Sequence, residues 1–411
     1  MNAKAKIETK PFALSIVVLL LLIQVIIQEH VALFQYFDEL VTVVCLVILL
    51  MHVGRRREIA QILIMMGILT LIGICGNLLF PIQKNVAAIF TDIGNMFKGF
   101  IVFLTFNLIF SESKKQHRAR KTIDYLDIYC KVLVVPGVIL ALLNLFVDIG
   151  MHTEYVYGLR SFHYIFLRMG NLRSACVSML IIMTAHMSVL SEKQKKRQFI
   201  YIVLTVLLMI STLRSRAFLY AVVYFGGYLY FVKGKKIRIK LWQIVLIVAA
   251  GLYIGLPKLN FFFRSSTAAR GVLLRYGITT GTTYFPVGAG FGSYGTFAAR
   301  QYWSPLYNTY SFSNYYGLSR QFGDFLTDDY WPAIIGEFGF FGTLLMATII
   351  VAIFRVVIRS TKSNSISRFS ALFGLIALYT ASLVSSSFFH TSAVCIMALV
   401  GIASALKGEE G

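Results

Sequence analysis

Charged residues are scarce in this chain, and acidic residues are the scarcest of them. Only 14% of the 411 residues are charged, whereas soluble domains average about 25%. Hydrophobic residues make up 57% of the chain, a share that excludes an ordinary soluble domain. Apolar runs of about 20 residues recur from end to end, and each is long enough to cross a hydrocarbon core about 30 Å thick. We therefore predict an all-α polytopic membrane protein.

The cysteine patterns of metal sites and disulfides are also lacking. All five cysteines fall inside apolar segments, with neither a CxxC pair nor a Cys/His cluster. We therefore expect no disulfide, no bound metal ion and no other cofactor. No small-residue cleavage site follows the apolar stretch 12–28, so this stretch is predicted to be a first transmembrane helix and not a signal peptide.

Acidic residues are too few to balance the basic ones. The chain has 39 Lys and Arg against 18 Asp and Glu, a formal net charge of +21. In a soluble protein this excess would suggest nucleic acid as a partner. Here most of it lies in short clusters between apolar runs, which is typical of topology signals. The sequence therefore predicts the lipid bilayer, and not nucleic acid, as the surrounding partner.

The basic clusters mark the predicted cytoplasmic loops, and two crossings fit between successive clusters. This gives about twelve helices with both termini in the cytoplasm, and the cytoplasmic (inner) membrane as the location. The predicted helices cover residues 12–28, 31–53, 59–80, 86–110, 128–148, 172–190, 198–213, 217–232, 241–257, 331–354, 369–389 and 391–406.

One long loop, at about residues 258–330, separates the N-terminal helices (1–257) from the C-terminal ones (331–411). Long loops are usually functional or disordered, and this one is too aromatic for disorder. Aromatic rings interleaved with Gly, Ser and Asn suit sugars, because a ring face packs on the apolar face of a pyranose. We predict an extracytoplasmic cap with short helices, either merely packed on the membrane domain or also binding glycan. Its candidate glycan-binding residues are Tyr294, Tyr302, Trp303, Tyr310, Tyr315 and Tyr316.

A set of arginines falls on the outer side of the predicted membrane, against the positive-inside rule. Retained positive charge there suggests an anionic ligand. Loop solubility or contact with lipid headgroups would explain any single one of them. The set comprises Arg160, Arg168, Arg173, Arg214, Arg216, Arg264, Arg270, Arg275, Arg300 and Arg320.

In two segments of the sequence, arginines of this set lie at or near a predicted turn. In the predicted helix hairpin 211–217, Arg214 and Arg216 are two residues apart and would diverge by about 200° on a helix, so only one is expected to face a cavity. Further on, a predicted surface helix with Arg270 leads into a glycine-rich turn at residues 288–295. Glycine permits positive φ and a close approach of backbone to a ligand.

A third segment, residues 324–342, runs directly into a transmembrane helix. Asp328 and Asp329 lie just before that helix and could simply cap it. Glu337 lies about two turns into the membrane, where a carboxylate is costly. We expect it to pair with an arginine or to close a polar cavity.

In this order, the three segments resemble the O-antigen ligase and Wzy-type polysaccharide polymerase superfamily, over about residues 198–390. The blocks that carry the resemblance are the SRxA-like Ser-Arg-Ala at residues 215–217, PxGxGxxSY at 286–294 and DxxWPxxxGExGxxG at 328–342. The resemblance implies a GT-C-like, metal-independent membrane glycosyltransferase that makes capsule, exopolysaccharide or O-antigen. It also implies undecaprenyl-diphosphate-linked oligosaccharides as substrates and other polysaccharide-assembly proteins as partners.

The resemblance also implies diphosphate-binding residues. By position, Arg270 matches the family's loop arginine, with Arg275 as the nearby alternative, and Arg216 matches the hairpin arginine. Arg160, on the shorter external loop, is a further candidate.

A general base must accept the proton of the acceptor hydroxyl. Ligases of the family carry a histidine about nine residues before the glutamate of ExGxxG. Here Asp328 stands at that position, beside Asp329, and the long loop has no histidine, which favours a polymerase over a ligase. Candidates for the catalytic residues are Asp328, Asp329, Glu337 and His163, with His390 as a further candidate for the base.

Two alternatives to the polymerase stay open. One is a ligase-type transferase to another acceptor. The other is a transporter or flippase of lipid-linked sugars, which could use the intramembrane charges Asp38, Asp92, Lys98 and Glu337, of which Asp92 and Lys98 are expected to pair. Transporters usually show two matching halves. No second half matches here, and this favours an enzyme.

Overall fold

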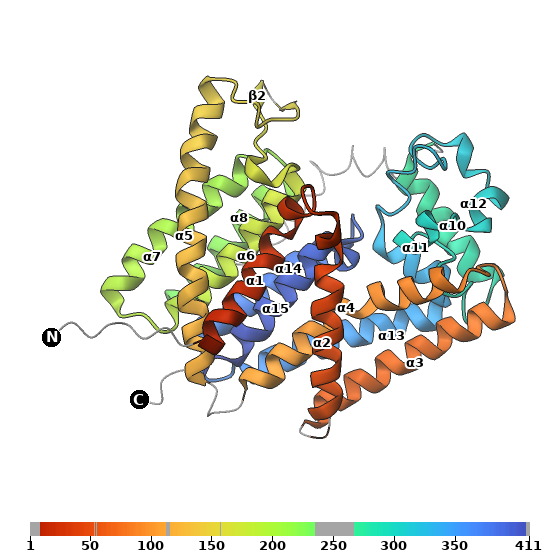
Figure 1. Cartoon of the computed structure of the whole chain (residues 1–411), viewed down its shortest axis with the longest axis horizontal. Helices are drawn as coiled ribbons and strands as arrows, with labels where there is room; N and C mark the ends of the chain where they lie inside the picture. Colours follow the sequence, from red (N-terminus) through yellow and green to blue (C-terminus); the bar gives the residue numbers. More distant parts are fainter. Residues whose placement is uncertain are drawn as a thin grey trace, which may run out of the picture.

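The computed structural model describes residues 9–52, 54, 56–111, 116–156, 158–234 and 267–407, and these are mostly helical (Figure 1). The predicted helix 241–257 and Arg264 lie outside the described residues. Among the described residues, six helical segments are long and apolar enough to cross a membrane: Lys10–Ile27, Ala32–His52, Arg57–Leu79, Val86–Phe110, Gln116–Phe146 and Tyr330–Ser360. The prediction of an all-α polytopic membrane protein is confirmed at this level.

The long helices follow the apolar segments closely. They are α1 (Thr9–Ile27), α2 (Phe37–His52), α3 (Arg57–Leu79), α4 (Val86–Phe110), α5 (Gln116–Phe146), α6 (Met169–Met187), α7 (Glu192–Ile210), α8 (Ser215–Gly227), α13 (Tyr330–Ser360), α14 (Ser365–Ser382) and α15 (Thr391–Ala405). Shorter turns of helix extend or precede several of them: η1 (Ala32–Tyr36), η4 (Tyr164–Phe166), η5 (Tyr228–Val232) and η7 (Ser387–Phe389). A two-stranded hairpin, β1 (Tyr155–Val156) and β2 (Leu159–Arg160), follows α5.

Helix α5 differs most from its prediction, because it begins at Gln116 and not near residue 128. Its first turns are polar on one side and therefore fall below the hydropathy of a membrane span. Their other side buries Ala119, Ile123 and Leu126 at the helical spacing of three to four residues. Packing of this stripe extends the helix beyond the apolar segment.

The centre of the molecule is built by the last helix, α15. Its sequence is rich in Ala, Gly and Ser, and it packs against α4, α6, α14 and α1. Within a membrane, helices associate mainly through van der Waals packing, because lipid supplies no hydrophobic driving force. Small residues favour this packing because they let the helix backbones approach closely. A Cβ atom added to Gly401 would lie 2.8 Å from Cβ of Phe106 on α4. Figure 1 shows α1, α14 and α15 side by side in the middle of the molecule.

The predicted loop forms a body with its own hydrophobic core. It contains α10 (Ala269–Thr283), α11 (Phe297–Gln301), α12 (Pro305–Thr309) and η6 (Phe312–Asn314). Buried side chains from these elements, including Val272, Tyr307 and Phe312, form a cluster separate from the main core. α10 packs along α13. In Figure 1 this body lies at the end of the molecule opposite to α5 and α7.

The glycine-rich turn fixes this body to the helices beneath it. Gly288 and Gly290 have φ of 78° and 84°, which confirms the predicted positive φ. A Cβ atom on Gly288 would lie 2.4 Å from the backbone nitrogen of Gly339, and one on Gly290 would lie 2.4 Å from that of Asn77. The close backbone approach is therefore made to α13 and α3, and not to a ligand as the sequence suggested.

Helix α13 bends where it meets the turn. Gly339 has φ of 63° and ψ of −169° inside the helix, and the backbone nitrogens of Ala289 and Gly290 donate to the carbonyl oxygens of Gly336 and Glu337 at 2.9 Å. The kink and the turn thus form one interlocked joint.

The expected ion pair between Asp92 and Lys98 is wrong. Lys98 Nζ lies 2.7 Å from Asp38 Oδ2 on α2, and the side chains of both residues are nearly inaccessible. Six residues along a helix correspond to about 240°, so Asp92 and Lys98 point to different faces of α4. Asp92 instead accepts a hydrogen bond from the backbone nitrogen of Gly292, at 2.7 Å.

Candidate functional site

A cavity of about 1260 Å³ lies where the ends of several helices meet. Residues of α6, α8, α10, α13, α14 and α15 line it. Five arginines and one carboxylate belong to its wall: Arg168, Arg173, Arg214, Arg216, Arg270 and Asp329. Positive charge therefore far exceeds negative charge on the cavity surface.

Two of the arginines come from the turn before α8. Leu213 has φ of 52°, and Arg214 is the extended N-cap residue of the helix. Arg214 pairs with Glu154, Nη2 to Oε1 at 3.2 Å, and Arg216 Nη1 donates to Ser385 Oγ at 3.1 Å. Both arginines line the cavity. The expectation that only one would do so is wrong, because Arg214 precedes the helix and does not follow its 100° rotation.

Two more arginines come from the start of α6. Arg168 is its extended N-cap residue, and Arg173 follows within the second turn. Both belong to the set of arginines that the sequence places on the outer side of the membrane, and the sequence predicts no individual role for either. Violation of the positive-inside rule was therefore the signal that found them.

The fifth arginine lies between two carboxylates. Arg270 Nη2 is 3.4 Å from Asp328 Oδ2, and its Nε is 3.8 Å from Asp329 Oδ1. α10 and the start of α13 pack together, and this brings the three side chains to one place. Asp329 is the N-cap residue of α13, but its side chain makes no capping hydrogen bond. Its carboxylate is therefore available to the cavity.

Burial dominates the electrostatics of this carboxylate pair. Burial outweighs the lowering charge of Arg270 and, together with the charge of Asp328, raises the pKa of Asp329 to about 7. Burial also raises the pKa of Asp328, against the lowering charge and hydrogen bond of Arg270. Near neutral pH Asp329 therefore exists in comparable amounts as acid and base, which is the condition for proton transfer.

His390 also lines the cavity, at the N-terminus of α15. Its side chain is exposed where it lines the cavity. Desolvation there and the charges of Lys98, Arg216, Arg173 and Arg168 together lower the pKa of its imidazole to about 4. The ring is therefore neutral at physiological pH.

Glu337 neither pairs with an arginine nor closes the cavity, so that expectation is wrong. Its Oε1 accepts hydrogen bonds from the backbone nitrogens of Ser293 and Tyr294, at 3.0 and 3.1 Å, and from Thr296 Oγ1 at 3.1 Å. These donors belong to the turn that carries the loop body. Glu337 is therefore a residue of the joint between loop and α13.

Three other candidate residues lie outside the cavity wall. His163 Nδ1 is 2.8 Å from the carbonyl oxygen of Tyr164, and Arg160 donates to that of Asn144 at 3.3 Å. Arg275 is exposed on α10, one turn beyond Arg270. Of the four predicted diphosphate-binding arginines, the structure brings Arg216 and Arg270 together.

The six aromatic candidates for glycan binding also lie outside the cavity wall. Tyr294 is fully buried, and its hydroxyl donates to the carbonyl oxygen of Leu273 at 2.7 Å, so it serves the core of the loop body. Tyr302, Trp303, Tyr310 and Tyr315 are half-buried, and the last three pack on that core. Tyr316 is 86% exposed.

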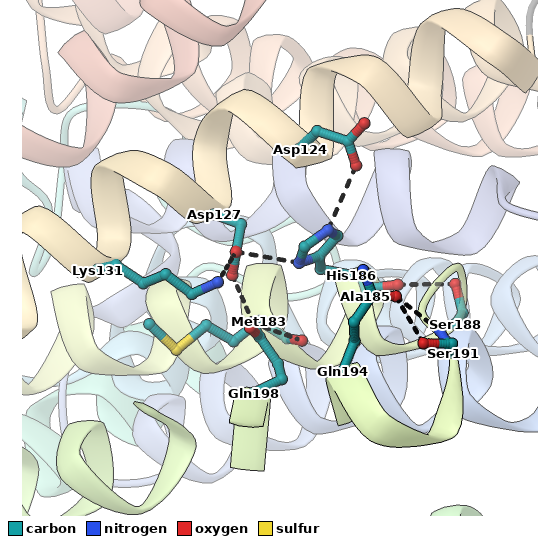
Figure 2. Close-up of polar contacts among 10 residues, drawn as sticks. All are labelled: Asp124, Asp127, Lys131, Met183, Ala185, His186, Ser188, Ser191, Gln194 and Gln198. Atoms are coloured by element: carbon teal, nitrogen blue, oxygen red, sulfur yellow. Dashed lines mark hydrogen bonds and ion pairs between the residues drawn. The ribbon is translucent and has the colours of Figure 1, made fainter. Parts of the chain in front are cut away.

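A second polar cluster lies on α5, α6 and α7 (Figure 2). His186 reaches Asp127 and Asp124, Nδ1 to Oδ2 at 3.0 Å and Nε2 to Oδ1 at 3.4 Å. Lys131 Nζ lies 2.5 Å from Asp127 Oδ2, and Gln198 Nε2 donates to Asp127 Oδ1. Figure 2 shows Asp127 as the residue on which these contacts converge. The cluster neutralises its charges internally and ties the three helices together.

Within the described residues, no group of three or more His, Cys, Asp or Glu side chains is arranged to hold a metal ion. Comparison of the chain with protein-family models gives no match, and comparison with curated proteins gives none either.

Proposed function

We propose that this chain is a membrane glycosyltransferase that polymerises undecaprenyl-diphosphate-linked oligosaccharide repeat units. In this proposal about twelve transmembrane helices form a GT-C-like frame in the cytoplasmic membrane. Both termini are cytoplasmic, and the loop at residues 258–330 covers the outer face. The product is a capsule, exopolysaccharide or O-antigen chain.

The observation that carries the proposal is the convergence of five arginines on one cavity with a single carboxylate in its wall. Arginine binds phosphate oxygens in two-point fashion through its planar guanidinium group. Five like charges around one cavity repel one another, and an anionic ligand would relieve this repulsion. The cavity also exceeds the roughly 300–1,000 Å³ that encloses a drug-sized ligand. A diphosphate with its attached sugar fits this size and charge.

The residues suggest how the transfer proceeds. Arg216, Arg270 and their neighbours bind the diphosphate of the donor. Asp329 accepts the proton of the acceptor hydroxyl while that oxygen attacks the anomeric carbon of the donor. The bond between the anomeric carbon and the phosphate oxygen breaks, and undecaprenyl diphosphate leaves with its negative charge stabilised by the arginines.

A reconstituted assay tests the proposal. Purified protein in lipid vesicles receives the lipid-diphosphate-linked repeat unit of its host, and the products are separated on a gel. A ladder of products is expected. Product only after addition of a different acceptor would assign the chain to ligase-type transfer. Translocation of the lipid across the vesicle membrane without any product would contradict an enzyme.

A further inference from the structure

One wall of the cavity differs chemically from the arginine walls. It is formed by the connection between α14 and α15, and its polar residues are Ser385, Ser387, His390 and Ser392. None of these is charged at neutral pH, since the pKa of His390 lies at about 4. Hydroxyl and imidazole groups donate and accept hydrogen bonds at the same time. Sugar hydroxyls do the same, whereas a phosphate oxygen only accepts.

Two of these side chains keep hydrogen-bonding capacity toward the cavity. Ser385 and Ser387 donate to the carbonyl oxygens of Ala381 and Leu378, at 2.9 and 3.1 Å. His390 has one contact, Nε2 to Ser386 Oγ at 3.4 Å, and its Nδ1 has no hydrogen-bond partner among the described residues. Ser392 lies two residues further on, at the start of α15, and also lines the cavity. The wall therefore offers polar groups that a ligand can occupy.

The position of His390 relates this wall to the arginines. Its ring lies close enough to Arg216, Arg173 and Arg168 for their charges to act on it, and Lys98, which is paired with Asp38, acts from α4. A diphosphate bound by these arginines would therefore carry its sugar beside the imidazole. A ring that both donates and accepts hydrogen bonds matches a sugar hydroxyl better than a diphosphate oxygen, which only accepts.

We propose that His390, with Ser392 beside it, forms the subsite for the sugar attached directly to the diphosphate of the donor. This inference rests on the proposed function. It makes His390 a specificity-determining residue, whose imidazole hydrogen-bonds a hydroxyl or acetamido group of that sugar. Asp329, which lines the cavity from the start of α13, is left to act on the acceptor.

Binding of two lipids separates this role from diphosphate binding. One probe is undecaprenyl diphosphate without sugar, and the other is the lipid-diphosphate-linked repeat unit of the host. His390→Ala should weaken binding of the sugar-bearing lipid about three- to tenfold, the loss of one net hydrogen bond, and leave binding of the bare lipid unchanged. His390→Gln should restore most of the loss, since its amide also donates and accepts. Arg216→Ala should weaken binding of both lipids.

Three results would overturn the inference. The first is an equal loss of binding for both lipids in His390→Ala, and the second is unchanged binding of both lipids in that variant. The third is a His390→Gln variant that binds the sugar-bearing lipid normally but makes no product. The last result would make His390 the base, because an amide cannot take up the proton. A fold control is the elution profile and melting temperature of each variant. Failure of the wild-type protein to bind the bare lipid or to form a ladder would instead count against the proposed function.

Discussion

Asp329 is held between burial, which favours its neutral form, and Arg270, which favours its charged form. The balance puts its pKa at about 7. A carboxyl with a raised pKa is neutral below that value and ionised above it, so its ability to accept a proton is gained as the pH rises through 7. In the proposed reaction this single group sets the pH dependence.

The turnover number is therefore expected to fall about tenfold for each pH unit below 7. Asp329→Asn should lower it by roughly 10²–10⁴ and remove the dependence, because an amide cannot act as a base. The rate of ladder formation between pH 5 and 9 measures both effects. As a control, Asp324→Asn removes a carboxylate that is 82% exposed and pairs with Arg300, and it should keep the wild-type profile. An unchanged profile in Asp329→Asn would assign the base elsewhere.

A matched pair of arginines on α10 tests diphosphate binding. Arg270→Ala should abolish product formation, because Arg270 lines the cavity and joins both carboxylates. Arg275→Ala, one turn away and exposed, should keep near wild-type activity. Gel filtration and melting temperature show whether each variant folds. Near wild-type activity in a folded Arg270→Ala variant would contradict the role of Arg270.

At this scale the sequence predicted part of the site. The sequence predicts four of its residues as binding or catalytic candidates: Arg216, Arg270, Asp328 and Asp329. The structure brings Arg270 to both carboxylates. Arg168 and Arg173 are recognised in the sequence only as misplaced charges, since their place in the cavity depends on how α6 and α8 each pack against α14. Glu337 is misassigned because two of its three hydrogen-bond donors are backbone nitrogens, which have no signature in a sequence.

At the scale of elements, the joint between the glycine turn and α13 holds the loop body in place. The turn approaches so closely that any side chain at Gly288 or Gly290 would collide with backbone. Glu337 supplies the carboxylate on which the turn converges, and Asp92 supplies a second one from α4. The motif GExG thus encodes a mechanical connection between the loop and the membrane helix.

Loss of this connection should cost stability more than chemistry. Glu337→Ala leaves the donors of Ser293, Tyr294 and Thr296 without their acceptor, at about 1–3 kcal/mol for each buried group. Glu337→Gln keeps one acceptor oxygen and should be milder. Thermal unfolding in detergent measures the difference. A Glu337→Ala variant with wild-type melting temperature but no activity would instead argue for a catalytic role.

Hydropathy predicted most helices but not their ends. α4 begins and ends at the predicted residues, because the apolar segment that predicts it ends with the helix and the side chain of Asn85 caps its start. α5 begins 12 residues before its prediction, since its polar first turns are held by packing and not by lipid. The helices within the loop follow the same principle: α10 was expected from its pattern, whereas five-residue helices such as α11 and α12 depend on their surroundings.

At the scale of the whole molecule, the loop body and the helices form two hydrophobic cores joined at α13. The cavity lies beside this junction and draws its wall from α10 of the loop body and from α6, α8, α13, α14 and α15. In the proposed orientation the loop body faces outward and Lys407 faces the cytoplasm.

Cysteine labelling tests this orientation. In a background without the five native cysteines, Tyr316→Cys should react with a membrane-impermeant maleimide in intact spheroplasts, because Tyr316 is 86% exposed on the loop body. Lys407→Cys should react only after the membrane is permeabilised. The reverse labelling pattern would show that the loop body faces the cytoplasm. The protein could then not act on lipid-linked repeat units at the outer face.

The central position of α15 has a consequence for biogenesis. The ribosome makes this helix after α1, α4, α6 and α14, yet it fills the slot between them and contributes His390 and Ser392 to the cavity. Until α15 is inserted, these earlier helices must wait in the bilayer, or with the insertion machinery, with that slot open. The cavity can therefore form only after α15 has entered the membrane.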